Sequence, residues 1–76
     1  SHAEGFYQEE SETAAVLLRP YALTNEREYF ADCFVYWITY RDNGKKMAAF
    51  QSAAPKTYAY LLALEEHNWQ STEQAA

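Results

Sequence analysis

Two carboxylates lie one helical turn apart in residues 21–34, YALTNEREYFADCF. At this spacing, Glu28 and Asp32 project from the same face of a helix. Asp32 is the only charged residue between Tyr29 and Tyr40, and burying a carboxylate without a partner is costly or shifts its pKa. Asp32 must therefore either lie on a hydrated stripe or meet a cation or hydrogen-bond donor. Residue types alone favour the simpler interpretation, in which Glu28 caps the helix and Asp32 faces water.

The other titratable side chains do not complete an active site. His2 lies in a segment, residues 1–3, that resembles an expression scar, and His67 lies near the end of an amphipathic helix. We interpret both histidines as surface residues. Cys33 is the only cysteine, which excludes disulfides. Because no histidine is near it in the sequence, Cys33 is typical of a small buried apolar group and not of a nucleophile.

The bulk composition describes one small acidic domain. The chain has 76 residues and a net charge of −5, and a chain of this length supports only a marginal core. Aromatic residues make up 17% of it. Lys45 and Lys46 are the only adjacent basic pair, so we expect no nucleic-acid partner. No apolar run is long enough to span a membrane.

The carboxylate pair lies in the longest helix that the sequence predicts, from residue 26 to about residue 41. Thr24 or Asn25 is its N-cap, and Asn25 precedes Glu28 by three residues, as in a capping box. The apolar residues of this helix fall on every side of the helical wheel, so we expect burial on several sides. Residues 42–44, DNG, end the helix and offer Asn or Gly for a left-handed C-cap.

Shorter elements must hold this helix in place. The sequence predicts an all-α fold, a small domain of about three to four helices. Met47 and Phe50 point inward from a two-turn helix, Pro55 lies in the first turn of the last helix, and Trp69 folds back onto the body. The predicted elements are a helix over 3–11, a connector over 12–23, the long helix, helices over 45–53 and 55–68, and a flexible tail over 70–76.

Two separate sequence boxes resemble a known family. The first is Tyr21 followed, after a short link, by NEREYFADCF (residues 25–34), and the second is APKTY (residues 54–58). In this order they resemble the C-terminal end of the anthrax lethal factor-like zinc metallopeptidases. That family includes the lethal factor catalytic domain and the secreted Pro-Pro endopeptidases. The resemblance implies that residues 4–69 are the C-terminal helical part of a zincin-like peptidase domain.

The resemblance implies a role for three residues. Glu28 matches the glutamate that supplies the third protein ligand to zinc, after the two histidines of a His-Glu-x-x-His helix. Tyr21, seven residues earlier, matches a tyrosine whose hydroxyl faces the substrate carbonyl. Asp32 matches an acid that steadies a zinc-bound histidine, with Asp here in place of the longer Glu.

The chain departs from the family because it contains no His-Glu-x-x-His motif. The general-base glutamate and two zinc ligands are absent, and one carboxylate cannot hold zinc in competition with water. We therefore expect zinc in the full-length protein, and neither tight zinc binding nor peptidase activity from these residues alone. The expected partners are the remainder of the peptidase domain, a peptide or protein substrate, and a second copy bound through an exposed apolar face of the long helix.

Two other functions remain open. Toxins of this family also carry a metal-free copy of the domain that docks to a partner, so one alternative is a non-catalytic binding module. The other lies outside the family: a small acidic helical domain whose aromatic residues form a partner groove. The presence of both Tyr21 and Glu28 at the family spacing favours the peptidase. The resemblance also implies secretion.

Overall fold

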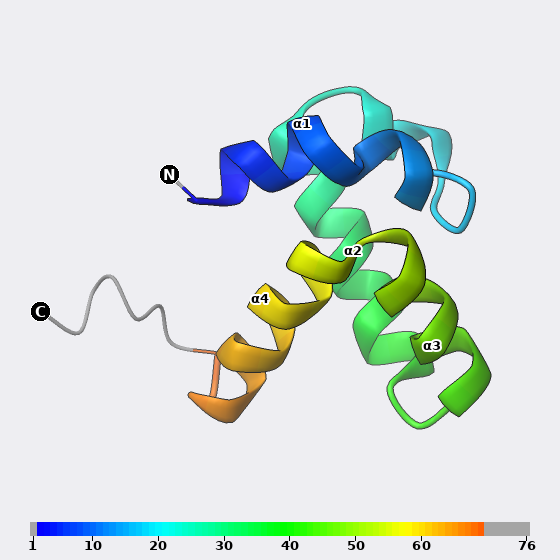
Figure 1. Cartoon of the computed structure of the whole chain (residues 1–76), viewed down its shortest axis with the longest axis vertical. Helices are drawn as coiled ribbons and strands as arrows, with labels where there is room; N and C mark the ends of the chain where they lie inside the picture. Colours follow the sequence, from blue (N-terminus) through cyan, green and yellow to red (C-terminus); the bar gives the residue numbers. More distant parts are fainter. Residues whose placement is uncertain (1, 70–76) are drawn as a thin grey trace, which may run out of the picture.

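A computed structural model describes residues 2–69, which form four α-helices and one 3₁₀ helix and, within that range, no strand. The side chains of His2, Ala3, Glu4 and Tyr21 lie outside the described part. The predicted all-α class is confirmed. In Figure 1, α1 crosses the top of the molecule, and α3 and α4 form an open hairpin in front of α2. The elements are α1 (His2–Ala14), η1 (Pro20–Leu23), α2 (Glu26–Tyr40), α3 (Gly44–Ala53) and α4 (Pro55–Glu66).

Asparagine side chains start α2 and α3. Asn25 Oδ1 accepts a hydrogen bond from the Glu28 backbone N–H at 2.9 Å, which confirms Asn25 as the N-cap of α2. Asn43 Oδ1 accepts in the same way from the backbone N–H three residues later, at 3.1 Å. The predicted left-handed C-cap after α2 is wrong, because neither Asn43 nor Gly44 has a positive φ. Asn43 is instead used, at φ −101°, to begin α3.

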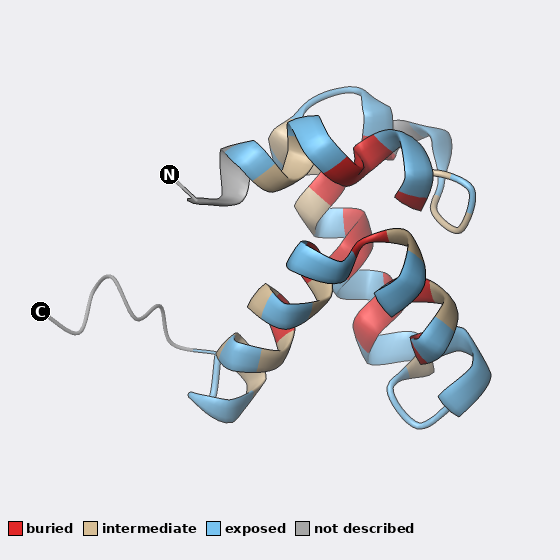
Figure 2. Ribbon diagram, in the orientation of Figure 1, coloured by how far each residue is buried: buried red, intermediate tan, exposed pale blue. Residues whose placement is uncertain are grey.

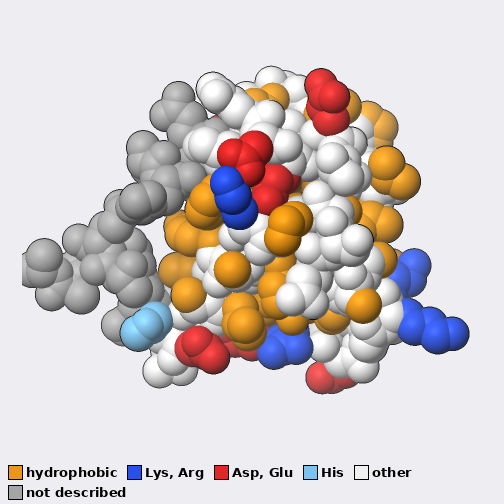
Figure 3. Space-filling model, in the orientation of Figure 1, with side chains coloured by type: hydrophobic (Ala, Val, Ile, Leu, Met, Phe, Trp, Pro, Cys, Tyr) orange, Lys and Arg blue, Asp and Glu red, His pale blue; other side chains and the backbone are white. Residues whose placement is uncertain are grey.

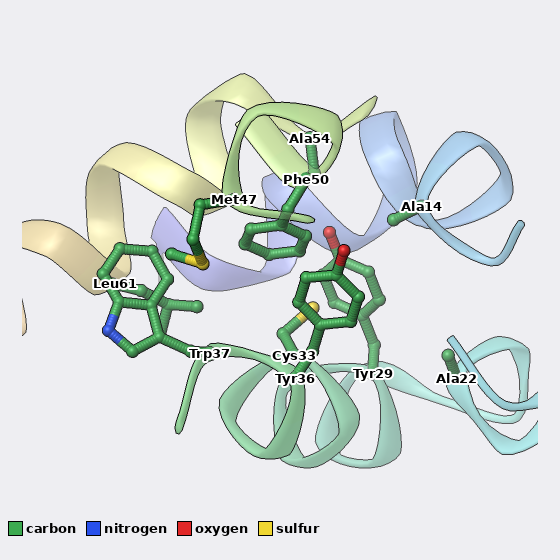
Figure 4. Packing of buried hydrophobic residues seen from close by; sticks show 10 residues of the cluster. All are labelled: Ala14, Ala22, Tyr29, Cys33, Tyr36, Trp37, Met47, Phe50, Ala54 and Leu61. Atoms are coloured by element: carbon green, nitrogen blue, oxygen red, sulfur yellow. The ribbon is translucent and has the colours of Figure 1, made fainter. Parts of the chain in front are cut away.

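The core lies between the inner face of α2 and the hairpin of α3 and α4. In Figure 4, Tyr29, Cys33, Tyr36 and Trp37 leave α2 on the side that faces Phe50 of α3. The Phe50 ring stacks on Tyr36 with centroids 5.3 Å apart and meets Trp37 edge-on at 6.4 Å. Figure 2 shows the buried residues gathered where the helices cross. The large aromatic content of the sequence therefore fills the core of a small domain.

The first helix is longer than predicted. The sequence predicts a helix over residues 3–11, whereas α1 continues to Ala14 and begins at His2, inside the segment that resembles an expression scar. A helix of this length is marginal by itself. It is stabilised here because it packs against α2, α3 and α4.

Two packing predictions are confirmed at the other end of the chain. Met47 and Phe50 are buried on the inner face of α3. Trp69 lies on the body, where its ring meets Phe34 edge-to-face with centroids 5.1 Å apart. The predicted flexible tail, residues 70–76, lies outside the described residues.

Candidate functional site

The entry into α2 brings together the elements that carry the three family residues. Tyr21 lies in η1, Glu28 in the first turn of α2 and Asp32 one turn further on. η1 packs directly against α2. Glu28 is half-buried, and its position is fixed by the Asn25 cap. The geometry of the site is therefore that of the helix face shared by Glu28 and Asp32, whereas the role of the Tyr21 hydroxyl stays a prediction.

Asp32 does not face water, so the simpler interpretation of this residue is wrong. Asp32 is only 4% exposed, and its Oδ1 accepts a hydrogen bond from Arg19 Nη2 at 2.7 Å. Arg19 comes from the connector that precedes η1 and keeps its side chain 68% exposed. The second oxygen, Asp32 Oδ2, is buried and has no hydrogen-bond partner among the described residues. A buried acceptor without a donor costs about 1–3 kcal/mol.

An open cavity of about 280 Å³ lies beside this carboxylate. Leu17 and Leu18 of the connector form one wall, and Val35 and Tyr40 of α2 form another. Asp32 and its partner arginine are also part of the lining. The cavity lies at the small end of the range for ligand sites, and its walls are mostly apolar.

The described residues do not form a zinc site by themselves. A catalytic zinc needs three protein ligands and a position for water. Among the side chains that the structure describes, those of residues 5–20 and 22–69, no three His, Cys, Asp or Glu are grouped so that they could hold a metal ion. His67 is the C-cap residue of α4, and His2 is the first residue of α1. Glu28 can therefore supply one ligand only, and zinc does not fit this part of the chain alone.

The buried thiol and hydroxyl of α2 are not nucleophiles. Burial raises the pKa of the Cys33 thiol to about 12, and burial also raises the pKa of the Tyr29 hydroxyl above its ordinary value. Both side chains are fully buried. They stay protonated and inaccessible at neutral pH, which confirms the interpretation of Cys33 as a small buried apolar group.

A second buried carboxylate, Glu10 of α1, holds the start of α4. This helix begins at Pro55 and has no side-chain cap of its own. Glu10 accepts hydrogen bonds from the backbone N–H groups of Lys56 at 2.8 Å and Thr57 at 2.9 Å, and from Thr57 Oγ1 at 2.7 Å. A residue far away in the sequence thus satisfies the free N–H groups of the first turn, where the helix dipole also favours negative charge.

The network continues from α4 into α2. Thr57 has one hydroxyl proton and gives it to Glu10, so the Tyr29 hydroxyl donates to Thr57 Oγ1, 2.8 Å away. The APKT box therefore ties three helices together, which gives a physical reason for its residue types. Sequence reasoning missed Glu10. The available signal was a helix start at Pro55 preceded by Ala54, which cannot cap.

An ion pair secures the opposite end of α2. Arg41 Nε and Nη2 donate to the Glu65 carboxylate at 2.8–3.0 Å, and Trp37 Nε1 donates to the same group at 3.0 Å. The Arg41 bonds, and then the Trp37 bond, hold the pKa of Glu65 below its ordinary value. This end of the helix is thus fixed to α4 without involving the Glu28 face.

The surface adds little that identifies a ligand. On the face shown in Figure 3, a basic side chain lies directly against acidic ones near the top, the other charges are scattered, and no continuous basic patch is formed. Over residues 2–69, no helix combines the length and the apolar character that crossing a bilayer requires.

The fold and these residues define a small helical domain whose longest helix presents a glutamate and a buried aspartate on one face. The family model described as "Anthrax toxin lethal factor, N- and C-terminal domain" matches residues 1–64, and the chain belongs to that family. The family is one of zinc metallopeptidases. No curated protein and no solved structure matches the chain.

Proposed function

We propose that this chain is the C-terminal part of a zinc endopeptidase of the lethal factor type. In this proposal Glu28 is one zinc ligand, Tyr21 presents a hydroxyl to the substrate, and the 76 residues do not hydrolyse peptides by themselves. The remainder of the peptidase domain supplies a His-Glu-x-x-His helix. The substrate is a peptide or protein, and the whole protein acts outside the cell, as secreted members of the family do.

The unpartnered Oδ2 of Asp32 is the observation that carries this proposal. Asp32 lies on the same stripe of α2 as Glu28, since residues 28, 32, 35 and 39 recur every three or four positions, and Asp32 lines the apolar cavity. Oδ2 itself is shielded from solvent, so an N–H donor that enters the cavity and displaces part of its wall would remove the cost of the unpaired oxygen. Because Arg19 already balances the charge of Asp32, a neutral imidazole fits better than a second cation. Donation to a carboxylate is also the usual way in which a zinc-binding histidine is oriented.

The rigidity of the helix start supports the same proposal. The Glu28 backbone N–H is held by Asn25, so the carboxylate projects from a fixed point of the first turn. η1, which contains Tyr21, packs against this helix. A metal ligand on a rigid element is held more precisely than one on a loop.

The test compares variants of the longer protein that carries the upstream sequence. Glu28→Ala should abolish zinc retention. Tyr21→Phe should leave zinc bound and lower kcat, and Asp32→Asn should lower zinc affinity about 10–100-fold. Glu26→Ala is the matched control, since it removes an acid from the same turn and should leave zinc content unchanged. Full zinc retention by Glu28→Ala would contradict the ligand assignment, as would the absence of any His-Glu-x-x-His motif upstream.

A second candidate function is a non-catalytic binding module of the same family. Large apolar side chains of α2 are exposed, with Val35 at 55% and Ile38 at 58%, and the matching family model covers both terminal domains of lethal factor. This function predicts that the longer protein contains no zinc and that Glu28→Ala leaves partner binding intact, while Ile38→Lys abolishes it. Zinc analysis of the longer protein therefore separates the two candidates.

A further inference from the structure

α2 carries a second exposed stripe that the proposed peptidase site does not use. Ala31, Phe34 and Ile38 recur at spacings of three and four residues and are all exposed, Phe34 at 40% and Ile38 at 58%. With 3.6 residues per turn, this stripe lies roughly 100° around the helix from that of Glu28 and Asp32. We call it the outer stripe. It is an apolar surface on the longest helix of the domain, and the Trp69 ring covers part of it at Phe34.

The ends of the outer stripe carry opposite charges. Arg27 lies one turn before Ala31 within α2, and Asp42 lies in the turn that directly follows α2; both charged residues are exposed. Between Asp32 and Arg41 the helix has no charged residue. The stripe therefore has an apolar centre with a cation at its N-terminal end and an anion at its C-terminal end.

Two copies of the outer stripe complement each other when their helices run in opposite directions, because the cation of each copy then faces the anion of the other. If two copies of α2 cross antiparallel about a point between residues 34 and 35, positions whose numbers add to 69 face each other. Arg27 of one copy then meets Asp42 of the other, twice. Ala31 meets Ile38, so a small side chain faces a large one, as close packing of two helices requires.

We propose that the outer stripe binds a second copy of this chain in an antiparallel, two-fold symmetric dimer. A two-fold interface uses the same patch on both subunits, and that patch must complement itself. The outer stripe meets this condition in both shape and charge. In this register Val35, which lines the cavity beside Asp32, lies opposite Phe34, so the dimer borders that cavity. The contacts that define the dimer include neither Glu28 nor Asp32, so the dimer does not depend on the proposed peptidase function.

The dimer is expected to be weak. One helix face from each copy buries less than the roughly 1,200 Å² that separates stable interfaces from transient ones. Because buried area alone does not fix affinity, the association must be followed over a wide concentration range. Sedimentation equilibrium from about 10 µM to about 1 mM covers that range.

The first variant tests the apolar centre. Ile38→Lys places a charge in the middle of the stripe and should leave the protein monomeric at every concentration. Because Ile38 is exposed, the substitution should not unfold the domain, and far-UV circular dichroism checks this.

Charge reversal tests the antiparallel register without touching the apolar residues. Asp42→Arg and Arg27→Asp should each weaken the homodimer about tenfold, because each turns two attractive contacts into repulsive ones. A mixture of the two variants should form a heterodimer, and the variant with both substitutions should recover the affinity of the original chain. Glu12→Arg, the same charge change at an exposed position of α1, should leave the dissociation constant unchanged.

Three results would overturn the proposal. If the chain is monomeric at all concentrations, it does not form this dimer, and another segment or a different partner binds the outer stripe. A dimer that survives Ile38→Lys would place the contact on another face. A double charge variant that fails to regain affinity would exclude the antiparallel register.

Discussion

The sharpest stability prediction concerns Glu10, whose carboxylate caps α4 from α1. Glu10→Ala removes the acceptor of three hydrogen bonds at 2.7–2.9 Å. Two of the three donors belong to Thr57, which is fully buried, so water cannot replace the lost acceptor without opening the core. The substitution therefore removes an N-cap and leaves buried donors unpaired at the same time.

The magnitude follows from these two losses. Loss of an N-cap costs about 1 kcal/mol, and each buried donor left unpaired costs about 1–3 kcal/mol. The two donors of Thr57 share one acceptor, so their costs do not add in full. We therefore expect Glu10→Ala to lower the free energy of unfolding by about 3–4 kcal/mol. A domain of this length has a free energy of unfolding of about 4–11 kcal/mol, so the loss amounts to at least about a quarter of its stability. The melting temperature should fall by roughly 12–30 °C.

Thermal and urea unfolding monitored by circular dichroism measure this effect. Glu9→Ala is a matched control, because it removes the same group from the neighbouring position. The side chain of Glu9 is 58% exposed and pairs with the Lys56 side chain, and an exposed ion pair contributes little. The melting temperature of Glu9→Ala should therefore stay close to that of the original protein.

The difference in melting temperature between Glu10→Ala and Glu9→Ala tests whether Glu10 stabilises the start of α4. If Glu10→Ala melts within a few degrees of Glu9→Ala, the cap does not stabilise α4 and the reasoning is refuted. Amide hydrogen exchange provides a local check, since the N–H groups of Lys56 and Thr57 should lose protection in Glu10→Ala alone.

Three further predictions follow from the buried and paired groups. Tyr29→Phe should cost about 1 kcal/mol in urea unfolding, because Thr57 loses a donor but keeps its bond to Glu10; an unchanged unfolding midpoint would exclude this bond. Cys33, buried and with its pKa raised to about 12, should react with a thiol reagent at pH 8 only after the protein unfolds, so rapid labelling of the native protein would contradict its burial. The pKa of Glu65 is lowered from its ordinary 4.5, chiefly by its hydrogen bonds to its arginine partner, so this pair stabilises the fold above pH 4.5 and ceases to do so as pH falls through the lower value. Glu65→Gln should therefore lower the melting temperature at pH 7 and lose that difference at low pH; a constant difference would show that the pair is not responsible.

The sequence predicts most of the local structure correctly because the signals for it are local. Asn25 is three residues from the N–H that it caps, and Pro55 can only begin a helix or break one. The all-α class follows from the length of the uninterrupted run over residues 26–41, which is too long for a strand although its aromatic residues would suit one. The error at Asn43 has a local cause as well, because Asn is favoured both after one helix and before the next, and here it begins α3.

Local sequence signals predict only part of the candidate site. The positions of Glu28 and Asp32 on one face of a helix follow from their spacing. How deeply each carboxylate is buried, and which groups it contacts, does not follow from that spacing. Asp32 has the pattern of a solvent-facing residue, yet it is buried by a connector in which the sequence shows no regular period.

What the sequence by itself determines, then, is the set of α-helices, the N-cap of α2 and the family to which the chain belongs. Only the tertiary structure decides which carboxylates are buried and what they meet. Asp32 finds its partner Arg19 across 13 residues, and Glu10 finds the start of α4 across 46 and 47 residues. No local pattern encodes such pairs, since they depend on how the helices pack, and the energy of burying a carboxylate is settled by that packing alone.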